Sequence, residues 1–564
     1  MSITCKINDR NYNSFYPHDL QTPYNNKIFD GDIINTQNEI INSPIRNKIL
    51  YGILILENNR TFGKHKNKNY YKCTPEQKNL PIFLIPYEIK TINFQTTNIN
   101  KYVSFKFDNW NQKHPVGQLL NVFGNTTDYN CYCEYYLSYL NLSISNKLFT
   151  DYLHKNQHII NSNLNLNINN ICEKYNIEKR IEQDDIIFTI DGSDTTDFDD
   201  AIGIKIINQN DNHYLLSIYI SNVPIILNEI DKWEYINRVS TIYLPTQKIH
   251  MLPKILSENI CSLVKNTQKI TFSLDIEIKN NIIINHTFKN VLINIKENYI
   301  YDETKLLNNN NYKLLFETIN NLNNNNPNLL NCKYIINDSH ELIAYLMILM
   351  NYYSSVAIQN NGIYRISSLI NYDENNENNN LPIEIKQFVT YWKNSEILQG
   401  ELLPLRSDSH YGLEQKKHDS LNLDTYIHIT SPIRRIVDIL NMYKLQIMLN
   451  IPNYSDGANI FYNKWTENIK SMDDTFKSIK KIQKNCLLYY TCLNNDNNKQ
   501  YVGYIIDKIQ KDNNYEYQIY IPEIKLISKI KSCDDIKIYN KCLCKIYIFN
   551  DENFLYNKIK IQII

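Results

Sequence analysis

The stretch Ile186-Ile187-Phe188-Thr189-Ile190-Asp191-Gly192-Ser193-Asp194-Thr195-Thr196-Asp197-Phe198-Asp199-Asp200-Ala201 decides how this chain folds and what it binds. It places five carboxylates within ten residues, directly after an apolar run. The run predicts a buried strand that ends at Asp191, and the Gly-Ser pair predicts a turn. A second extended stretch follows, in which Asp197 and Asp199 face one way and Asp200 begins the next apolar run.

Acids so close together repel one another, so a fixed arrangement of them calls for bound cations or water. Ligands that are all oxygen favour Mg²⁺ or Mn²⁺ over zinc. Enzymes that hydrolyse phosphodiesters commonly use two such ions held close together. Two plainer interpretations stay open, a solvated acidic loop and a single structural calcium site. The helix-loop-helix calcium pattern, with its fixed Gly and Glu positions, is absent.

The second informative segment is Tyr426-Ile427-His428-Ile429-Thr430-Ser431-Pro432-Ile433-Arg434-Arg435-Ile436-Val437-Asp438. Ser431 before Pro432 predicts a helix start, with Ser as N-cap and Pro at the first helical position. Arg434 would lie in the first turn, where a cation is unfavourable for the helix unless an anion such as phosphate binds there. The alternative is an ordinary surface arginine that pairs with Asp438 four residues on.

Together these two segments resemble the RNB family of 3′→5′ exoribonucleases, the ribonuclease II and R group that includes the catalytic subunit of the eukaryotic RNA exosome. The four acids Asp191, Asp197, Asp199 and Asp200 match the acidic signature of that family position for position. Residues 431–435 match its Ser-Pro-Ile-Arg-Arg signature. Residues 238–245, 251–253 and 256–263 resemble its middle blocks. The chain looks closest to the exosome type, without the nuclease domain that precedes it there.

The resemblance implies a catalytic site. Asp191 and Asp200 would be metal ligands, with Asp197 and Asp199 completing the site and positioning the attacking water. Arg434 would neutralise charge that builds on the scissile phosphate. The implied cofactor is Mg²⁺, with Mn²⁺ as the alternative, and two ions are expected.

The resemblance also implies RNA contacts. Tyr301 matches the tyrosine that clamps the 3′-terminal bases, and Tyr243 matches an aromatic residue further up the RNA channel. Stacking on an aromatic ring tolerates any base. Further RNA-binding residues implied in the same way are Arg365, Arg435 and Ser431.

One region departs from the family. Asp338 and Glu341 predict a capping box at the start of a buried helix. Where the family has two glutamates in this helix, the chain has Ala344-Tyr345. Asn222 replaces an acid of the family, and Met442-Tyr443 replaces a His-Arg pair. These changes spare the four acids and Arg434 but put the grip on the RNA 3′ end in doubt.

The expected fold class is α+β, a mixed α/β RNB catalytic domain flanked by β-barrel OB-folds. The barrel before it is cold-shock-like and the one after it is of the ribosomal-protein RNA-binding type. Short apolar runs at 49–55, 82–86 and 102–107 support the first barrel, and a run at 501–506 opens the second. The expected domains are a remnant of a first cold-shock-like barrel at 1–45, a cold-shock-like OB-fold at 46–150, a linker at 151–183, the catalytic domain at 184–495 and a C-terminal OB-fold at 496–564.

Composition fits this interpretation. The chain has 564 residues, 43% hydrophobic, with a formal net charge of +0, so RNA binding must come from local patches and a shaped channel. Twelve cysteines without a Cys-x-x-Cys pair predict reduced thiols, and the pairs Cys131/Cys133 and Cys542/Cys544 are expected on strands. Asparagine-rich stretches near 307–332 and 371–380 are expected to form surface loops. With no signal peptide or membrane-spanning stretch, an intracellular location is expected, cytoplasmic or nuclear.

We therefore predict a metal-dependent 3′→5′ exoribonuclease that hydrolyses single-stranded RNA to nucleoside 5′-monophosphates. The partner is single-stranded RNA, no membrane is involved, and association with other RNA-decay factors stays open. The alternative is a weak or inactive RNB-fold protein that binds RNA or acts as a scaffold, which the altered clamp residues favour mildly. A third alternative is a calcium-stabilised binding protein that only mimics the motif.

Overall fold

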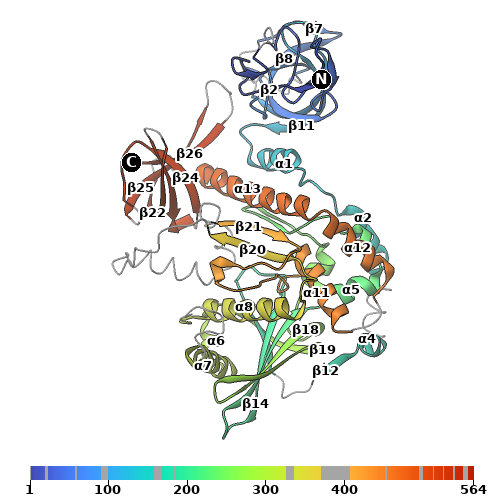
Figure 1. The fold of residues 1–564 in the computed structure, drawn as a ribbon, viewed down its shortest axis with the longest axis vertical. Coiled ribbons are helices and arrows are strands. Elements are labelled where there is room, and N and C mark those ends of the chain that lie inside the picture. The colour runs from blue at the N-terminus through green and yellow to red at the C-terminus, as the bar shows by residue number, and fades with distance from the viewer. Residues whose placement is uncertain are drawn as a thin grey trace. The chain divides into compact units, whose positions relative to one another are not determined.

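The computed structural model describes residues 2–564 except 19–22, 58–59, 90–98, 158–167, 182–185, 326–335, 370–406, 451–453, 495–498, 512–513, 525, 538–539 and 551–556. The chain divides into two compact units. The first unit comprises Met1–Ser143, Lys481–Ile536 and Lys541–Ile564, and the second comprises Ile144–Lys480 and Lys537–Asn540. Figure 1 shows the helices and strands of both. The five domain ranges expected from the sequence stay a prediction.

The amino-terminal part of the first unit is built on a six-stranded sheet in the order β6-β10-β11-β9-β8-β7. Because β6 also pairs with β8, the sheet closes on itself as a small barrel. Its core is aromatic, with Phe29, Phe83, Phe105 and Trp110 buried. The strands are β6 (Ile49–Leu54), β7 (Lys64–His65), β8 (Lys68–Pro75), β9 (Phe83–Tyr87), β10 (Lys101–Asn109) and β11 (Val116–Asn125). Short strands precede it: β1 (Ile3–Thr4), β2 (Lys6–Ile7), β3 (Phe15–Tyr16), β4 (Ile33–Ile34) and β5 (Ile40–Asn42).

The carboxy-terminal part of the first unit is a five-stranded antiparallel sheet in the order β24-β23-β22-β25-β26. The strands are β22 (Gln500–Lys511), β23 (Asn514–Ile521), β24 (Leu526–Ser532), β25 (Lys541–Asn550) and β26 (Asn557–Ile563). Cys542 and Cys544 lie on β25 with their sulfur atoms 3.9 Å apart, so they share a face as predicted.

The prediction for the other cysteine pair is wrong. Cys131 and Cys133 lie on helix α1 (Tyr129–Tyr139), which Asp128 caps by accepting the Cys131 N–H at 2.8 Å. All eleven cysteines in the described residues are free thiols, and Cys332 lies outside them.

The second unit is built on a six-stranded mixed sheet in the order β12-β19-β13-β14-β15-β18. The long strand β19 runs parallel to β13 and antiparallel to β18, which closes the sheet on itself. The strands are β12 (Ile177–Arg180), β13 (Ile187–Asp191), β14 (Asp200–Asn208), β15 (His213–Ser221), β18 (Gln268–Lys279) and β19 (Ile282–Ile300). Strand β13 is buried from Ile187 to Ile190 and ends at Asp191, as the sequence predicted.

Helices α7 (Asn310–Asn325) and α8 (Ser339–Ala357) pack against this sheet (Figure 1). The Asp338 side chain accepts the Glu341 N–H at 2.8 Å, so the predicted N-cap is confirmed. The expectation of surface loops near 307–332 is wrong for residues 310–325. Leu315, Ile319 and Leu322 of this segment recur at helical spacing and are buried, and their packing outweighs the polar asparagines. Residues 371–380 lie outside the described residues.

The second unit also contains further α-helices and strands and one π-helical turn. They are α2 (Lys147–Lys155), α4 (Ile168–Lys174), α5 (Val223–Ile230), β16 (Ile242–Leu244), β17 (Gln247–Ile249), a π-helical turn (Ile255–Ile260), α6 (Thr304–Leu307), β20 (Tyr364–Leu369), β21 (Ser407–Gly412), α11 (Ile436–Met448) and α12 (Asp456–Glu467). Helix α13 (Ile469–Asn494) continues from the second unit into the first. Among the helices in the described ranges, none is both long enough and apolar enough to span a bilayer.

Candidate active site

The acidic segment runs from the end of β13 to the start of β14. Asp191 is the last residue of β13, and Asp200 is the first of β14. Between them, Thr195 N–H donates to the Gly192 carbonyl at 3.1 Å and closes the predicted turn. Asp197 and Asp199 are 7% and 4% exposed, so their carboxylates face the interior rather than solvent. A solvated acidic loop, the plainest interpretation of the sequence, does not describe these two side chains.

A neighbouring segment holds the acidic loop in place. Leu263 N–H donates to the Phe198 carbonyl at 3.0 Å. The Ser262 hydroxyl accepts the Phe198 N–H at 2.9 Å and donates to the Thr196 carbonyl at 3.1 Å. These three bonds fix the backbone on both sides of Asp197, which orients the acids without using their own oxygen atoms.

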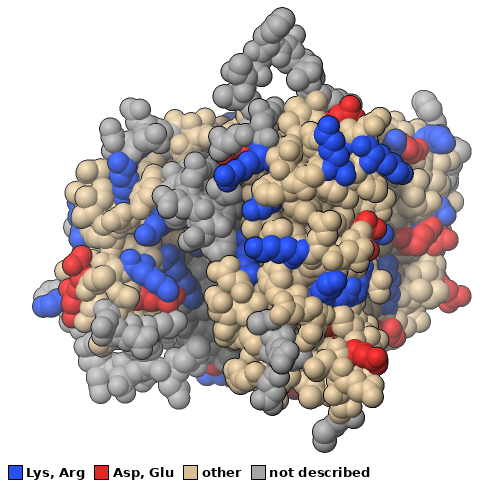
Figure 2. Space-filling model, turned by 90° about the horizontal axis from the view of Figure 1, so that it is seen from above, with Lys and Arg blue, Asp and Glu red and all other residues tan. Residues whose placement is uncertain are grey.

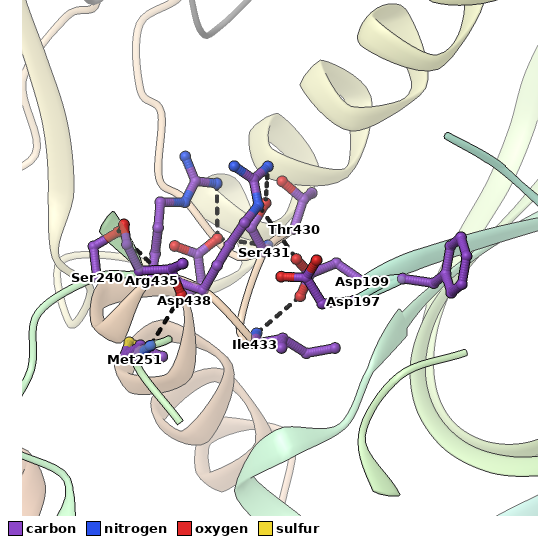
Figure 3. A network of polar contacts seen from close by, with 12 residues as sticks. Asp197, Asp199, Ser240, Met251, Thr430, Ser431, Ile433, Arg435 and Asp438 are labelled. Carbon is purple, nitrogen blue, oxygen red and sulfur yellow. Dashed lines mark hydrogen bonds and ion pairs between the residues drawn. The ribbon is translucent and has the colours of Figure 1, made fainter. Parts of the chain in front are cut away.

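The second predicted segment meets the first at Asp199. The Ile433 N–H donates to Asp199 Oδ1 at 2.8 Å (Figure 3). Arg434 Nε lies 3.3 Å from Asp199 Oδ2. Arg434 Nη2 also donates to the Ser431 hydroxyl at 2.9 Å. Two segments more than 230 residues apart in the chain therefore form one site.

The predicted helix start at Ser431 is wrong. Helix α11 begins at Ile436, and residues 431–434 form a turn in which the Arg434 and Arg435 N–H groups donate to the Ser431 carbonyl. Asp438 Oδ1 accepts the Ser431 N–H at 2.7 Å and lies 2.9 Å from Arg435 Nη2. The arginine that pairs with Asp438 is therefore Arg435, so the alternative of an Arg434–Asp438 pair is excluded.

Burial perturbs the acids. It raises the pKa of Asp199 to about 8, although the Arg434 charge and the Ile433 N–H both act to lower it. Burial also raises the pKa of Asp191 to about 7, and the Asp199 charge adds to this against a hydrogen bond from Thr189. Without a further cation, the fold therefore disfavours the ionised forms of both carboxyls.

The donor set fits an oxygen-seeking cation. Asp191 Oδ2 and Asp197 Oδ2 are buried, and neither has a hydrogen-bond partner in the described part of the chain. Buried carboxylate oxygens without partners are costly, and a divalent ion would satisfy them. Within the described ranges, no three His, Cys, Asp or Glu side chains converge closely enough to hold an ion by themselves. Water would have to supply most of the coordination.

Sequence reasoning missed Lys248. Its Nζ forms an ion pair with Asp197 Oδ1, and it lies 5.3 Å from the centre of the Tyr243 ring. Tyr243 and Lys248 are cross-strand partners in the β16–β17 hairpin, one pair away from its turn, but the sequence carries no signal that this hairpin meets the acidic loop.

The predicted RNA-binding tyrosines lie close to the acids. Tyr243 is 40% exposed. Burial of its hydroxyl raises the pKa of Tyr243; the Arg434 charge acts against this rise, and the charges of Asp197 and Asp199 add to it. The Tyr301 N–H donates to the Asp191 carbonyl at 3.0 Å, and its ring stacks on His340 with centroids 3.7 Å apart.

The predicted RNA-binding arginines have partners within the fold. Arg365 donates to the Ser409 hydroxyl at 2.6 Å and lies over the Tyr411 ring. Its Nη1 lies 3.9 Å from Asp473 Oδ1, so these contacts are with β21 and α13 rather than with the acidic segment. Arg435 is paired with Asp438 as described above. On the face seen in Figure 2, Lys and Arg lie singly or in small groups among uncharged residues, as the zero net charge leads one to expect.

Comparison with protein families gives a match to the RNB domain over residues 180–314 and 304–451. The chain belongs to the RNB family. It is 36% identical over 181 residues to ribonuclease R of Mycoplasmopsis pulmonis, covering 31% of this chain and 22% of that protein. It is 24% identical over 384 residues to ribonuclease R of Buchnera aphidicola, covering 55% of this chain and 51% of that protein. The chain thus aligns with about half or less of these relatives.

Solved structures show the same fold. Mycoplasma genitalium RNase R in complex with ribose methylated single-stranded RNA superposes with a TM-score of 0.68 and 16% identity, covering 100% of both chains. Yeast Ssd1, described as a pseudonuclease, superposes with a TM-score of 0.57 and 13% identity, covering 97% of this chain and 81% of that one. The predicted fold class, an α+β RNB domain flanked by OB-folds, is confirmed.

Proposed function

We propose that this chain is a metal-dependent 3′→5′ exoribonuclease that hydrolyses single-stranded RNA to nucleoside 5′-monophosphates. The observation that carries the proposal is the meeting of Asp199 with Ile433 and Arg434. Buried carboxylates and a guanidinium therefore lie together in one site, as the hydrolysis of a phosphodiester requires. Family membership and the ribonuclease R relatives support the choice of RNA as substrate.

Each residue of the site has a distinct task in this proposal. Asp191, Asp197, Asp199 and Asp200 would form the site for Mg²⁺ or Mn²⁺, with Asp191 Oδ2 and Asp197 Oδ2 as the buried oxygens that have no partner among the described residues. Such an ion, when bound, supplies an activated water and neutralises phosphate charge. Arg434 has five N–H donors, of which its contacts with Asp199 and Ser431 use two, so others are available to the phosphate oxygens.

Base stacking would hold the RNA without regard to sequence. Tyr243 is the predicted stacking residue with the clearer geometry, because its ring is partly exposed beside the acids. Tyr301 is proposed to contact the 3′-terminal bases, with Arg365, Arg435 and Ser431 supporting the RNA path. The Ser431 and Arg435 contributions would act through the turn that positions Arg434.

The experiment uses 5′-labelled single-stranded RNA with Mg²⁺, with Mn²⁺ and with chelator. The parent chain is compared with Asp199→Asn and with Asp194→Asn, a matched change at an exposed acid of the same loop. We expect metal-dependent shortening from the 3′ end in the parent and in Asp194→Asn, and a loss of at least about 100-fold in Asp199→Asn. Equal activity in Asp199→Asn and the parent would refute the assignment.

A second candidate is an RNA-binding protein that does not hydrolyse RNA. The observation that favours it is the fold similarity to yeast Ssd1, described as a pseudonuclease. In the same experiment it predicts tight RNA binding by the parent chain with no shortening under either metal.

A further inference from the structure

We propose that the Lys248 ammonium takes the place of one divalent cation in the acid cluster, so that the site holds a single Mg²⁺ or Mn²⁺ ion. The inference deepens the proposed function and rests on it. The sequence predicted two ions. We infer one ion instead because of Lys248, which lies outside the acidic segment.

The hairpin of β16 and β17 places the Lys248 ammonium next to the acids. Tyr243 and Lys248 are directly opposite in this hairpin, so both side chains leave it on the same face. Lys248 Nζ forms its ion pair with Asp197 Oδ1 and lies 5.3 Å from the Tyr243 ring centre. The Lys248 side chain is 24% exposed and that of Asp197 6% exposed. A carboxylate and an aromatic face thus both attract the ammonium in a partly dehydrated place.

Donors from the chain already occupy both carboxylate oxygens of Asp199 and one of Asp197. Asp199 uses Oδ1 for the Ile433 N–H and Oδ2 for Arg434, and Asp197 uses Oδ1 for Lys248. Among the oxygens of the four acids, Asp191 Oδ2 and Asp197 Oδ2 are buried without a hydrogen-bond partner in the described residues. One Mg²⁺ is typically held by one or two carboxylates and several waters, so these two oxygens suffice for one ion.

A second ion would have to compete with the ammonium for Asp197. Two cations on the same carboxylate repel each other, and this repulsion is weakly screened in a buried site. Lys248 would have to leave both Asp197 and the Tyr243 ring before a second ion could bind with its full ligand set. The lysine instead supplies a fixed positive charge beside the phosphate path.

The test counts Mn²⁺ ions bound to the intact chain without RNA, by equilibrium dialysis at saturating Mn²⁺. An Asp191→Asn/Asp200→Asn chain measures binding elsewhere on the surface, which is subtracted. We compare the parent with Lys248→Met and Lys248→Gln, which remove the charge. The matched control is Lys289→Met, an exposed lysine of the same unit that pairs with Glu178. Two neutral substitutions guard against one that fails to fold.

We expect one ion in the parent and in Lys289→Met, and two ions in the folded Lys248 variant. Two ions in the parent would overturn the proposal. One ion in both parent and variant would also overturn it, because the lysine would then not set the number. No ion above background would overturn this proposal and the metal-dependent exonuclease together.

The RNA assay separates the two proposals. One ion in the parent and two in the Lys248 variant, without any RNA shortening, would refute the exonuclease and leave the role of Lys248 standing. Metal-dependent shortening by a parent that binds two ions would support the exonuclease and refute the role of Lys248.

Discussion

Replacing Asp199 by asparagine should abolish hydrolysis and yet stabilise the metal-free fold. Asparagine keeps an acceptor for the Ile433 N–H, which lies 2.8 Å from Asp199 Oδ1. It also removes a carboxyl whose pKa burial raises to about 8 from its ordinary value of 3.8. The folded metal-free chain therefore binds a proton that the unfolded chain releases at neutral pH, and this difference disfavours folding.

The size of the effect depends on pH in a defined direction. Below pH 3.8 both states are protonated and Asp199 has no effect, whereas above pH 8 the full destabilisation is present. With these two pKa values, Asp199 destabilises the metal-free fold by about 2 kcal/mol at pH 5 and by about 5 kcal/mol at pH 7.5, as upper values. Asparagine does not titrate, so Asp199→Asn should recover most of this, and more at pH 7.5 than at pH 5.

Scanning calorimetry in the presence of a chelator measures the effect. The melting temperatures of the parent, Asp199→Asn and Asp194→Asn are compared at pH 5 and pH 7.5. The exposed Asp194 should change stability by no more than about 0.5 kcal/mol at either pH. If Asp199→Asn lowers the melting temperature at pH 7.5, or raises it equally at both pH values, the inferred burial of an unfavourable carboxylate is wrong.

Three further predictions concern the arginine, the clamp and the helix cap. Arg434→Lys keeps the charge but loses the planar fork, so single-turnover hydrolysis should fall at least about 100-fold while RNA affinity changes little; a rate within tenfold of the parent would contradict this role. Tyr301→Ala should lengthen the final RNA fragment by weakening the 3′-end grip, whereas Tyr301→Phe should not; identical fragments from all three chains would count against the clamp. Asp338→Ala should cost about 1 kcal/mol in urea unfolding by removing the N-cap of α8, and Asp338→Asn should restore most of it; a loss equal in both variants would assign the effect to something other than the cap.

The parts of the fold that local sequence determines were predicted. Strand β13 ends at Asp191 and β14 begins at Asp200 because apolar runs stop and start there. Asp338 caps α8 because its side chain reaches the N–H three residues on. In each case the residues that decide the structure are neighbours in the sequence.

The failures come from contacts between distant residues. Ser431 looks like an N-cap, but Asp438 holds its N–H and Arg435 forms a β-bridge with Ser240, so the helix begins later. Lys248 was missed because its meeting with Asp197 depends on where the β16–β17 hairpin lies against the acidic loop.

The energetics of the acid cluster bear on whether the chain hydrolyses RNA or only binds it. A protein that only binds RNA gains nothing from a buried carboxylate that its own fold disfavours, and asparagine would bind the Ile433 N–H equally well. A divalent ion present at 100 times its dissociation constant stabilises the fold by about 2.7 kcal/mol, which offsets roughly half of the destabilisation at pH 7.5. The parent should therefore gain stability on adding Mg²⁺, and Asp199→Asn should gain clearly less. If the two gain equally, the Asp199 charge does not stabilise a bound ion, and the argument from its unfavourable burial to catalysis fails.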